Sequence, residues 1–348
     1  MPTVLHVLPH RGGGGETYID VLGALEGFRH ARAPLSAGPT PAAAATSIPL
    51  RWGRIARAAR HADLVHAHGD VAAALALPLL RNRPSVVTTH GLHFLRRATG
   101  ARGVAAERAV RAFARAATRI ICTSQAEHDE LAALLGPRLE AKLVTVTNGI
   151  ELPAPAAPAQ RAAIRAGLDL ADGDVVALFL GELSERKGVL VAVQAAHRVA
   201  GAGAPLVLLV AGDGPQAAEV RAQASPAVRA LGFCGDPGSL LAAADVFVLP
   251  SRREGLSFAI LEAMGHGLAS IVADGAGNAE AVGDAGVVVP ADDVRALAAA
   301  LERFVGDEAL RRRLGDAARE RVRVTFSQDR MLAGVAAVYG AALAAYGA

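Results

Sequence analysis

Two glutamates eight residues apart point most directly to chemistry in this sequence. Glu254 and Glu262 lie in residues 250–267, which follow a short apolar run and are expected to open a helix near Ser257. The first backbone N–H groups of a helix have no partner within it, so they form an anion site suited to phosphate. The residues that would supply these groups are Gly255, Leu256, Ser257 and Phe258.

The two carboxylates suit hydroxyl groups better than phosphates. Glu262 lies about one turn inside the expected helix, where it can accept hydrogen bonds from a ribose diol, as acidic residues do at other nucleotide sites. Glu254 precedes the helix and would face a sugar. A structural alternative stays open, in which both glutamates lie on the surface of the helix and Ser257 is its N-cap.

Two glycine-rich stretches are further candidates for ligand contact. Gly12–Gly15 lie between an expected strand and an expected helix, where glycine lets the backbone approach a ligand closely. We expect Gly14 and Gly15 at the ligand, with a merely permissive loop as the alternative. Residues 212–217 imitate a dinucleotide fingerprint, but Pro215 interrupts it and no acidic residue ends a strand about 20 residues later, so NAD is not expected.

Four histidines stand in close pairs, His66 with His68 and His90 with His93. Imidazoles at such spacings can converge on zinc. No carboxylate or cysteine completes the set, so we expect no metal and assign His66 and His68 to the structure or to the lining of a cleft. His90 ends a buried-type strand, where it can hydrogen-bond a sugar or serve the structure alone.

The elements that must position these residues follow an alternating pattern. Apolar runs of four to seven residues alternate with longer helical patterns along the chain, which is typical of parallel sheets covered by helices on both faces. In the first half the expected strands are residues 4–8, 64–67, 85–88, 120–123 and 143–146. In the second half they are residues 175–180, 206–211, 246–249, 270–273 and 287–289.

A linker divides the chain near its middle. Asn148-Gly149 is a turn signal, and three prolines follow in an alanine-rich stretch that we expect to be neither helix nor central strand: Pro153, Pro155 and Pro158. The sequence thus predicts an α/β fold of two Rossmann-like, doubly wound parallel-sheet domains facing a cleft, where ligands of such sheets bind. The predicted domains are residues 1–149 and 150–330.

Composition excludes several classes of protein. Of the 348 residues, 52% are hydrophobic and 20% are charged, so the chain is far from the composition of disordered proteins. Cys122 and Cys234 are too few for a disulfide framework and favour a reducing cytoplasm. Residues 331–348 carry no charge, but they are mostly Ala and Gly, which suits a closely packed helix better than a membrane span.

Positive charge gathers in the first half of the chain. Residues 1–150 carry 18 basic and 10 acidic side chains, whereas residues 151–348 carry 18 and 23. Four arginines would form one stripe on a helix: Arg108, Arg111, Arg115 and Arg119. This face either makes peripheral contact with an anionic membrane or a phosphorylated acceptor, or it is simply solvated. Nucleic acid is not expected, because aromatic residues make up only 4% of the chain.

The ordered motifs resemble one known family, the retaining GT-B glycosyltransferases of family 4 (glycosyl transferases group 1). Glu254 and Glu262 match the E-x7-E motif of that family. In the first half, residues 12–16, 63–68, 88–91, 123–124 and 147–150 follow the family's order and spacing. In the second half, residues 181–188, 211–215, 244–245, 277–280 and 283–286 do so. The resemblance covers essentially the whole chain.

The resemblance implies a role for each matched residue. Glu262 would hold the donor ribose, Glu254 the transferred sugar and Lys187 the donor diphosphate. His90 would reach the sugar from the other domain, which makes His90, Glu254 and Lys187 the expected catalytic set. A lysine and helix N–H groups aimed at the leaving diphosphate would stabilise its departure without a metal or another cofactor. The resemblance also implies that the helix at about 331–348 packs back on the N-terminal domain.

One position departs from the family pattern. The family usually has an arginine directly after the glycine at position 181, where it grips the diphosphate, but this chain has Glu182. Three nearby arginines are candidates to replace it, because a guanidinium binds phosphate bidentately: Arg186, Arg252 and Arg253. We include Arg186 in the predicted donor site.

The resemblance therefore implies a cytoplasmic, metal-independent hexosyltransferase that moves a sugar from a nucleoside diphosphate sugar to an acceptor hydroxyl. The acceptor, a lipid, a glycan or a small molecule, would be held by the N-terminal domain, and the enzyme would work free or at the inner face of the membrane. Two alternatives stay open: a UDP-sugar 2-epimerase on the same fold, and a catalytically silent nucleotide-binding homologue. The second alternative rests on Glu182, which stands where the family has an arginine.

Overall fold

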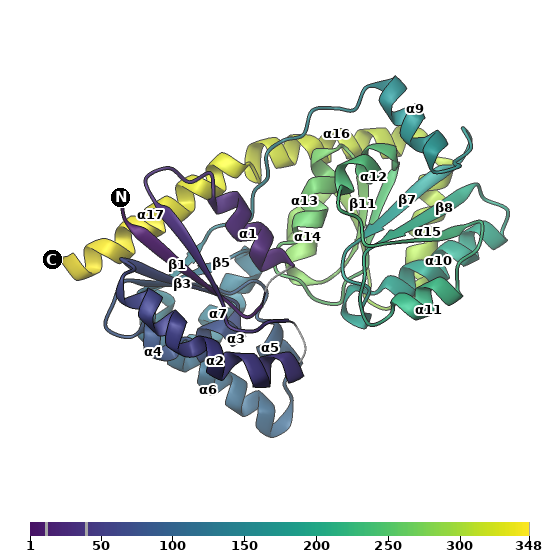
Figure 1. Cartoon of the computed structure of the whole chain (residues 1–348). Helices are drawn as coiled ribbons and strands as arrows, with labels where there is room; N and C mark the ends of the chain where they lie inside the picture. The colour runs from purple at the N-terminus through teal and green to yellow at the C-terminus, as the bar shows by residue number, and fades with distance from the viewer. Residues whose placement is uncertain (11–12, 39–40, 348) are drawn as a thin grey trace. The chain divides into compact units, whose positions relative to one another are not determined.

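The chain folds into two units, each built on one parallel six-stranded sheet (Figure 1). The computed structural model describes residues 1–10, 13–38 and 41–347. One unit contains Met1–Asn148 and Gln328–Ala348, and the other contains Gly149–Ser327. The prediction of two doubly wound, Rossmann-like α/β domains is confirmed.

The sheet of the second unit has the strand order β12-β11-β10-β7-β8-β9. Its strands are β7 (Val175–Leu180), β8 (Leu206–Ala211), β9 (Val228–Gly232), β10 (Val246–Leu249), β11 (Ala269–Ala273) and β12 (Gly286–Val289). The order reverses between β7 and β10, and ligands of open α/β sheets generally bind at such a point. Five of the strands match the predicted ones closely, and β9 at the edge is an additional strand.

The sheet of the first unit has the strand order β2-β1-β3-β4-β5-β6. Its strands are β1 (Thr3–Leu8), β2 (Arg29–Pro34), β3 (Leu64–His68), β4 (Ser85–Thr88), β5 (Arg119–Cys122) and β6 (Leu143–Thr145). Here the order reverses between β1 and β3. The additional strand β2 is an edge strand with the sequence RHARAP, and its polar, partly exposed residues carry no continuous apolar run.

Helices connect the strands of both sheets. In the first unit they are α1 (Gly14–Leu22), α2 (Pro41–Arg60), α3 (Asp70–Leu75), α4 (Leu77–Leu80), α5 (His93–Arg97), α6 (Gly100–Ala116), α7 (Gln125–Leu135), α8 (Pro137–Glu140) and the C-terminal α17 (Gln328–Gly347). In the second unit they are α9 (Pro158–Gly167), η1 (Glu185–Lys187), α10 (Val189–Gly201), α11 (Ala217–Ala222), α12 (Pro237–Ala243), α13 (Phe258–Gly265), α14 (Ala276–Val282), η2 (Gly283–Ala285), α15 (Val294–Gly306) and α16 (Glu308–Thr325).

Two sequence interpretations need correction at the level of these elements. Pro158 does not end the structureless linker but begins α9, where a proline in the first turn costs no hydrogen bond. Arg119 does not extend the arginine stripe along a helix, because α6 ends at Ala116 and Arg119 opens β5. The stripe on α6 therefore consists of Arg108, Arg111 and Arg115.

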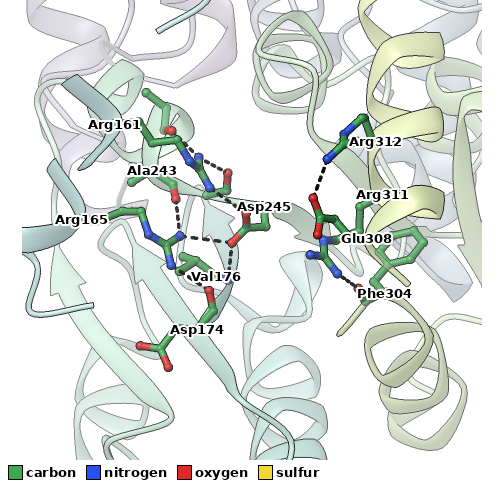
Figure 2. A network of polar contacts seen from close by, with 12 residues as sticks. Arg161, Arg165, Asp174, Val176, Ala243, Asp245, Phe304, Glu308, Arg311 and Arg312 are labelled. Carbon is green, nitrogen blue, oxygen red and sulfur yellow. Dashed lines mark hydrogen bonds and ion pairs between the residues drawn. The ribbon is translucent and has the colours of Figure 1, made fainter. Parts of the chain in front are cut away.

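Asp245 ties α9 to the sheet of the second unit (Figure 2). Its carboxylate accepts hydrogen bonds from Arg161 Nη2 at 2.7 Å, Arg165 Nη1 at 3.2 Å and the backbone N–H of Val176 at 2.8 Å. Asp245 belongs to one of the motifs shared with the family, and this geometry gives it a structural task. Figure 2 also shows the ion pair of Glu308 with Arg312 at 2.5 Å, one turn apart on α16.

The C-terminal helix α17 completes the first unit, although it follows the second unit in sequence. Its Tyr339 is fully buried and its hydroxyl lies 2.7 Å from Nδ1 of His66 on β3. Over the described part of the chain, no helix combines the length and the apolar character needed to cross a bilayer. The uncharged residues of α17 instead contact β3, β4 and α1.

Candidate active site

Two loops meet where the strand order of the second unit reverses. The loop after β7 contains η1 and Gly188, and the loop after β10 begins at Pro250. The backbone N–H of Arg252 donates to the carbonyl of Arg186 at 3.0 Å. Gly188 has a φ of 71°, and a Cβ atom there would lie 2.3 Å from the carbonyl oxygen of Pro250. Only glycine permits this approach, so the two loops are held at a fixed spacing.

The polar centre of these loops is the carboxylate of Glu254. One of its oxygens, Oε1, lies 2.5 Å from Arg186 Nη1 and 2.8 Å from Lys187 Nζ. Glu254 is only 6% exposed, and the side chain of Lys187 is 13% exposed. Three of the predicted site residues therefore form one ion-paired cluster. A carboxylate this deeply buried is stabilised as an anion by its two cationic partners.

Glu182 enters the same cluster through Arg186. Its Oε2 accepts from Arg186 Nη2 at 3.0 Å, so the guanidinium bridges Glu182 and Glu254. Two carboxylates thus share Arg186, and its role toward a phosphate stays a prediction. Arg252 instead pairs with Glu185 at 2.6 Å and Asp292 at 2.8 Å on the surface.

The start of α13 adds backbone donors beside this cluster. Gly255 and Leu256 are buried, and Ser257 is at the N-cap position without a capping bond from its side chain. A Cβ atom on Gly277 would lie 1.4 Å from the carbonyl oxygen of Gly255, so α14 fixes this turn by direct backbone packing. The hydroxyl of Ser257 thus leaves the first N–H groups of α13 to other acceptors.

Glu262 lies further along α13 and is half-buried. Burial raises the pKa of this carboxyl, because water stabilises its charge less there. Its contact with a ribose diol stays a prediction.

Gly14 and Gly15 lie in the first unit, at the start of α1. Gly13 is the N-cap residue with a φ of 74°, Gly14 is exposed and Gly15 is half-buried. Gly12 lies outside the described residues. The turn therefore offers backbone N–H groups at a helix N-terminus, directly after β1.

His90 follows β4 in the first unit and has an unusual backbone. Its φ of 52° is in the left-handed region, which costs energy for a residue other than glycine. The next residue, Gly91, donates its N–H to Oε1 of Glu127 at 2.5 Å, and the other oxygen of Glu127 accepts from the N–H of Thr123 at 2.7 Å. Glu127 on α7 thus fastens the loop that carries His90.

Two buried carboxylates near His90 were absent from the predicted site. Glu127 is fully buried, and Asp70 accepts the N–H groups of Phe94 and Leu95 at the start of α5 at 2.8 and 2.9 Å. Burial raises the pKa of both carboxyls. A sequence signal for Glu127 does exist, because Ser124 and Glu127 have the spacing of a capping box and the Ser124 hydroxyl accepts from Glu127 N at 3.1 Å.

The histidines of the first unit gather differently from their sequence pairs. His66 and His68 on β3 lie beside His6 on β1, and one ligand-type nitrogen of each lies within 4.8 Å of the others. All three are buried. His6 was not predicted because it stands alone in an apolar strand, and only the strand register pairs it with His66.

Comparison with known proteins places the chain among enzymes of one kind. Residues 5–153 match the family described as Glycosyltransferase Family 4, and residues 174–307 match Glycosyl transferases group 1. The chain is 34% identical to glycogen synthase of Mycobacterium tuberculosis, over 80% of this chain and 69% of that protein. It is 32% identical to alpha-maltose-1-phosphate synthase of the same organism, over 78% of this chain and 77% of that protein.

Solved structures of low sequence identity share the fold. The Anabaena protein Alr3699/HepE in complex with UDP and glucose has a TM-score of 0.81 at 20% identity, covering 98% of this chain and all of that one (100%). Sucrose-phosphate synthase from Thermosynechococcus elongatus has a TM-score of 0.80 at 22% identity, covering 99% of this chain and 100% of that one.

Proposed function

The chain belongs to the family 4 glycosyltransferases (glycosyl transferases group 1) and is a glycosyltransferase. From this premise we propose that it transfers a hexosyl residue from a nucleoside diphosphate sugar to an acceptor hydroxyl with retention of configuration. The donor would bind to the second unit. The observation that carries the proposal is the meeting of Lys187, Arg186 and Glu254 beside the start of α13.

The proposed donor site is built for a leaving diphosphate. Breaking the bond between the sugar and the phosphate oxygen builds negative charge on the phosphates. Lys187 Nζ and the first N–H groups of α13 would stabilise that charge in a poorly hydrated site. Lys187 Nζ and Arg186 Nη1 lie 2.8 and 2.5 Å from Oε1 of Glu254. A bound diphosphate would compete for these cations and release the Glu254 carboxylate for a sugar hydroxyl.

The proposed chemistry needs no side-chain nucleophile. The bond from the anomeric carbon to the leaving phosphate oxygen breaks, and the acceptor oxygen forms its bond to the same carbon on the same face. The acceptor proton passes to the leaving phosphate. We propose that the positive charge comes from Lys187, Arg186 and helix N–H groups, without a metal, so turnover should withstand EDTA.

The identity of the donor is supported by relatives. HepE was solved with UDP and glucose, and two relatives at 32% and 34% identity are named as synthases of maltose-1-phosphate and of glycogen. These names favour a hexose on a nucleoside diphosphate. The acceptor depends on side chains of the first unit, and a hydroxyl of a glycan, a lipid or a small molecule satisfies the chemistry.

The test is ligand stabilisation followed by turnover. UDP, GDP, ADP and their common sugar conjugates are compared by thermal shift on the native chain and on Glu262→Ala. A ligand at about 100 times its Kd stabilises by about 2.7 kcal/mol, so one base should raise Tm clearly, and the variant should lose the shift. Stabilisation by none of the nucleotides would contradict the proposal.

Turnover separates the proposal from its two alternatives. The bound sugar conjugate should be hydrolysed slowly to nucleoside diphosphate and free sugar, and NMR of the first product formed should show the donor's anomeric configuration. A 2-epimerase would instead yield the sugar inverted at C2. A silent homologue would bind nucleotide and release no diphosphate with any acceptor.

A further inference from the structure

Four imidazoles form a continuous hydrogen-bonded chain across one face of the sheet of the first unit. His30 Nδ1 lies 2.8 Å from His6 Nε2, His6 Nδ1 lies 2.9 Å from His68 Nε2, and His68 Nδ1 lies 3.1 Å from His90 Nε2. We call His30, His6, His68 and His90 the histidine chain. It begins on the edge strand β2, crosses β1 and β3, and ends in the loop after β4 that carries His90.

Strand register brings these side chains to one face of the sheet. His6 on β1 is aligned with His66 on β3, and His68 follows His66 by two residues, so all three point to the same side. His66 is held apart from the chain by two other bonds, at 2.7 Å to the Tyr339 hydroxyl and at 2.7 Å to Thr88 Oγ1. The histidine chain thus has one defined set of hydrogen-bonded members, which does not include His66.

The members of the chain are uncharged near neutral pH. His6 and His68 are buried, and burial lowers the pKa of His6 to about 3 and that of His68 well below its usual range. Burial also lowers the pKa of His30, and it lowers that of His90 to about 3. Each neutral ring has one N–H donor and one nitrogen acceptor.

Each link joins Nδ1 of one ring to Nε2 of the next, which restricts the nitrogen on which each ring can carry its proton. If one ring carries its proton on Nε2, its Nδ1 must accept from the neighbour, whose proton is then also on Nε2. All three links can be satisfied in only two ways, with every ring protonated on Nε2 or every ring protonated on Nδ1. Any mixture leaves two lone pairs or two N–H groups facing each other in a buried site, which is costly.

We propose that the histidine chain sets the tautomer of His90, so that His30 and His6 act as positioning residues for the nitrogen that His90 presents to the substrate. The nitrogen of His90 outside the chain is Nδ1. The role toward substrate rests on the proposed function, whereas the shared tautomer does not. A change of sense from Nε2–H to Nδ1–H moves one proton along each of the three links, while His30 Nε2 releases one proton and His90 Nδ1 takes one up, so no net proton is consumed.

The sense of the histidine chain decides what His90 offers to a substrate. No described group meets His30 Nε2 in hydrogen-bond geometry. With every ring protonated on Nε2, His90 Nδ1 would accept a hydrogen bond from a substrate hydroxyl. With every ring protonated on Nδ1, His90 Nδ1 would donate one to a substrate oxygen.

The direct test is histidine NMR on the native protein labelled with ¹⁵N. Long-range ¹H–¹⁵N spectra at pH 7.5 report for each ring which nitrogen carries the proton. The expected result is one shared tautomer for all four rings, either Nε2–H throughout or Nδ1–H throughout. A mixture of tautomers among the four, or an imidazolium among them, overturns the proposal. Binding of a metal ion by these rings would overturn the proposal too, so spectra are also recorded with added Zn²⁺. Joint changes in the ¹⁵N chemical shifts of His6, His66 and His68 on adding zinc would indicate zinc ligation instead.

Variants test whether the coupling reaches His90. His30→Asn removes the half-buried end of the chain and does not touch His90, and His61→Asn changes an exposed histidine outside it as a control. His30→Asn should change the ¹⁵N shifts of His90, and His61→Asn should not. A second variant, His6→Gln, breaks the chain at its centre, and the dispersed spectrum of the remaining residues reports whether it folds. Unchanged ¹⁵N shifts of His90 in both His30→Asn and His6→Gln would overturn the proposal.

Kinetics of the same variants separate this proposal from the proposed function. Nucleotide stabilisation by the second unit should be retained in His30→Asn, while kcat/KM should fall about tenfold or more, since loss of the group that sets a catalytic histidine's tautomer costs up to about 10⁴-fold in a hydrolase triad. Full activity with a mixed-tautomer His90 would overturn the positioning role alone. Loss of nucleotide binding in the native chain would instead contradict the donor site.

Discussion

One carboxylate oxygen of Glu254 pairs with two cations, Arg186 and Lys187. The carboxylate is buried, so it interacts strongly with Arg186 and Lys187, at 2.5 and 2.8 Å. A diphosphate brings more negative charge and more oxygen acceptors than one carboxylate does. Exchange of partners, and not the creation of new charge, is therefore the step that we expect on donor binding.

Replacing Lys187 tests this exchange. Lys187→Met should weaken nucleoside diphosphate binding by about 10-fold to 150-fold, because a hydrogen bond to a charged group contributes about 1.5 to 3 kcal/mol. Isothermal titration measures the affinity. The matched control is the only other lysine, Lys142, which donates to the backbone carbonyls of Ala114 and Ala117 in the first unit. Equal effects of Lys187→Met and Lys142→Met would contradict this role.

Glu182 is the residue that sets how freely Arg186 can reach a phosphate. Glu182→Gln should strengthen diphosphate binding by about 1.4-fold to 5-fold, because it removes an exposed carboxylate that contributes about 0.2 to 1 kcal/mol to the pairing with Arg186. Arg186→Gln should weaken binding. The control, Glu308→Gln, breaks a pair of the same spacing on α16. Weaker binding by Glu182→Gln would show that the carboxylate positions Arg186 instead of restraining it.

At the scale of elements, the apolar strands could be predicted and the polar edge strands could not. Buried central strands such as β7 and β10 consist of uninterrupted apolar residues, which the sequence displays directly. In β2 the residues are mostly polar, and its position follows only from pairing with β1. The acidic and basic site residues after β7 and β10 were found from motifs. Glu127 and His6 act through contacts between elements far apart in sequence, which no local pattern contains.

The contact between α9 and the second sheet depends on Asp245. Asp245→Asn keeps the shape but removes the charge that faces Arg161 and Arg165, and we expect the second unit to lose about 2 kcal/mol of unfolding free energy. Urea unfolding measures the change. Glu308→Gln, which removes an exposed carboxylate, should change the unfolding free energy by less than about 0.5 kcal/mol. Comparable losses would mean that Asp245 is no more than a surface partner.

The buried histidines make the stability of the first unit sensitive to acid. Burial lowers the pKa of His6 and His90 to about 3, so between about pH 6.5 and 3 the unfolded chain binds protons that the folded one does not. Stability is therefore full above pH 6.5 and falls by about 1.4 kcal/mol per histidine for each pH unit below it. Raised pKa values of Asp70 and Glu127 act in the opposite sense.

A comparison of slopes isolates the histidine effect. The unfolding free energy of His6→Gln should fall less steeply between pH 6.5 and 5.5 than that of the native chain, by about one proton. His61→Gln changes an exposed histidine and should leave the slope as it was. Identical slopes in all three proteins would mean that His6 is protonated in the folded state.

At the scale of the whole molecule, charge separates the two halves of the chain. The excess of basic residues in residues 1–150 and of acidic residues in residues 151–348 sets up two regions of opposite sign. On α6, Arg108 and Arg115 are exposed, next to Arg111. We propose that this helix makes peripheral contact with anionic membranes.

Vesicle binding tests this contact. Vesicles containing phosphatidylglycerol should retain the protein in sedimentation at about 20 mM salt and release it at about 500 mM, because the attraction is screened within a Debye length. The triple replacement of Arg108, Arg111 and Arg115 by Gln should abolish retention. Triple replacement of Arg311, Arg312 and Arg313 on α16 is the control. Equal binding to neutral vesicles would point to apolar insertion instead.

The return of α17 to the first unit also sets the order in which the protein can form. Residues 149–327 leave the ribosome as one uninterrupted stretch and contain their whole sheet, whereas the sheet made from residues 1–148 lacks the helix that covers His66 until residues 328–347 are translated. The half synthesised first is thus the half finished last. A newly made chain would expose the face of β3 and β4 during all that time, which makes this face the place where a chaperone or a premature partner would bind.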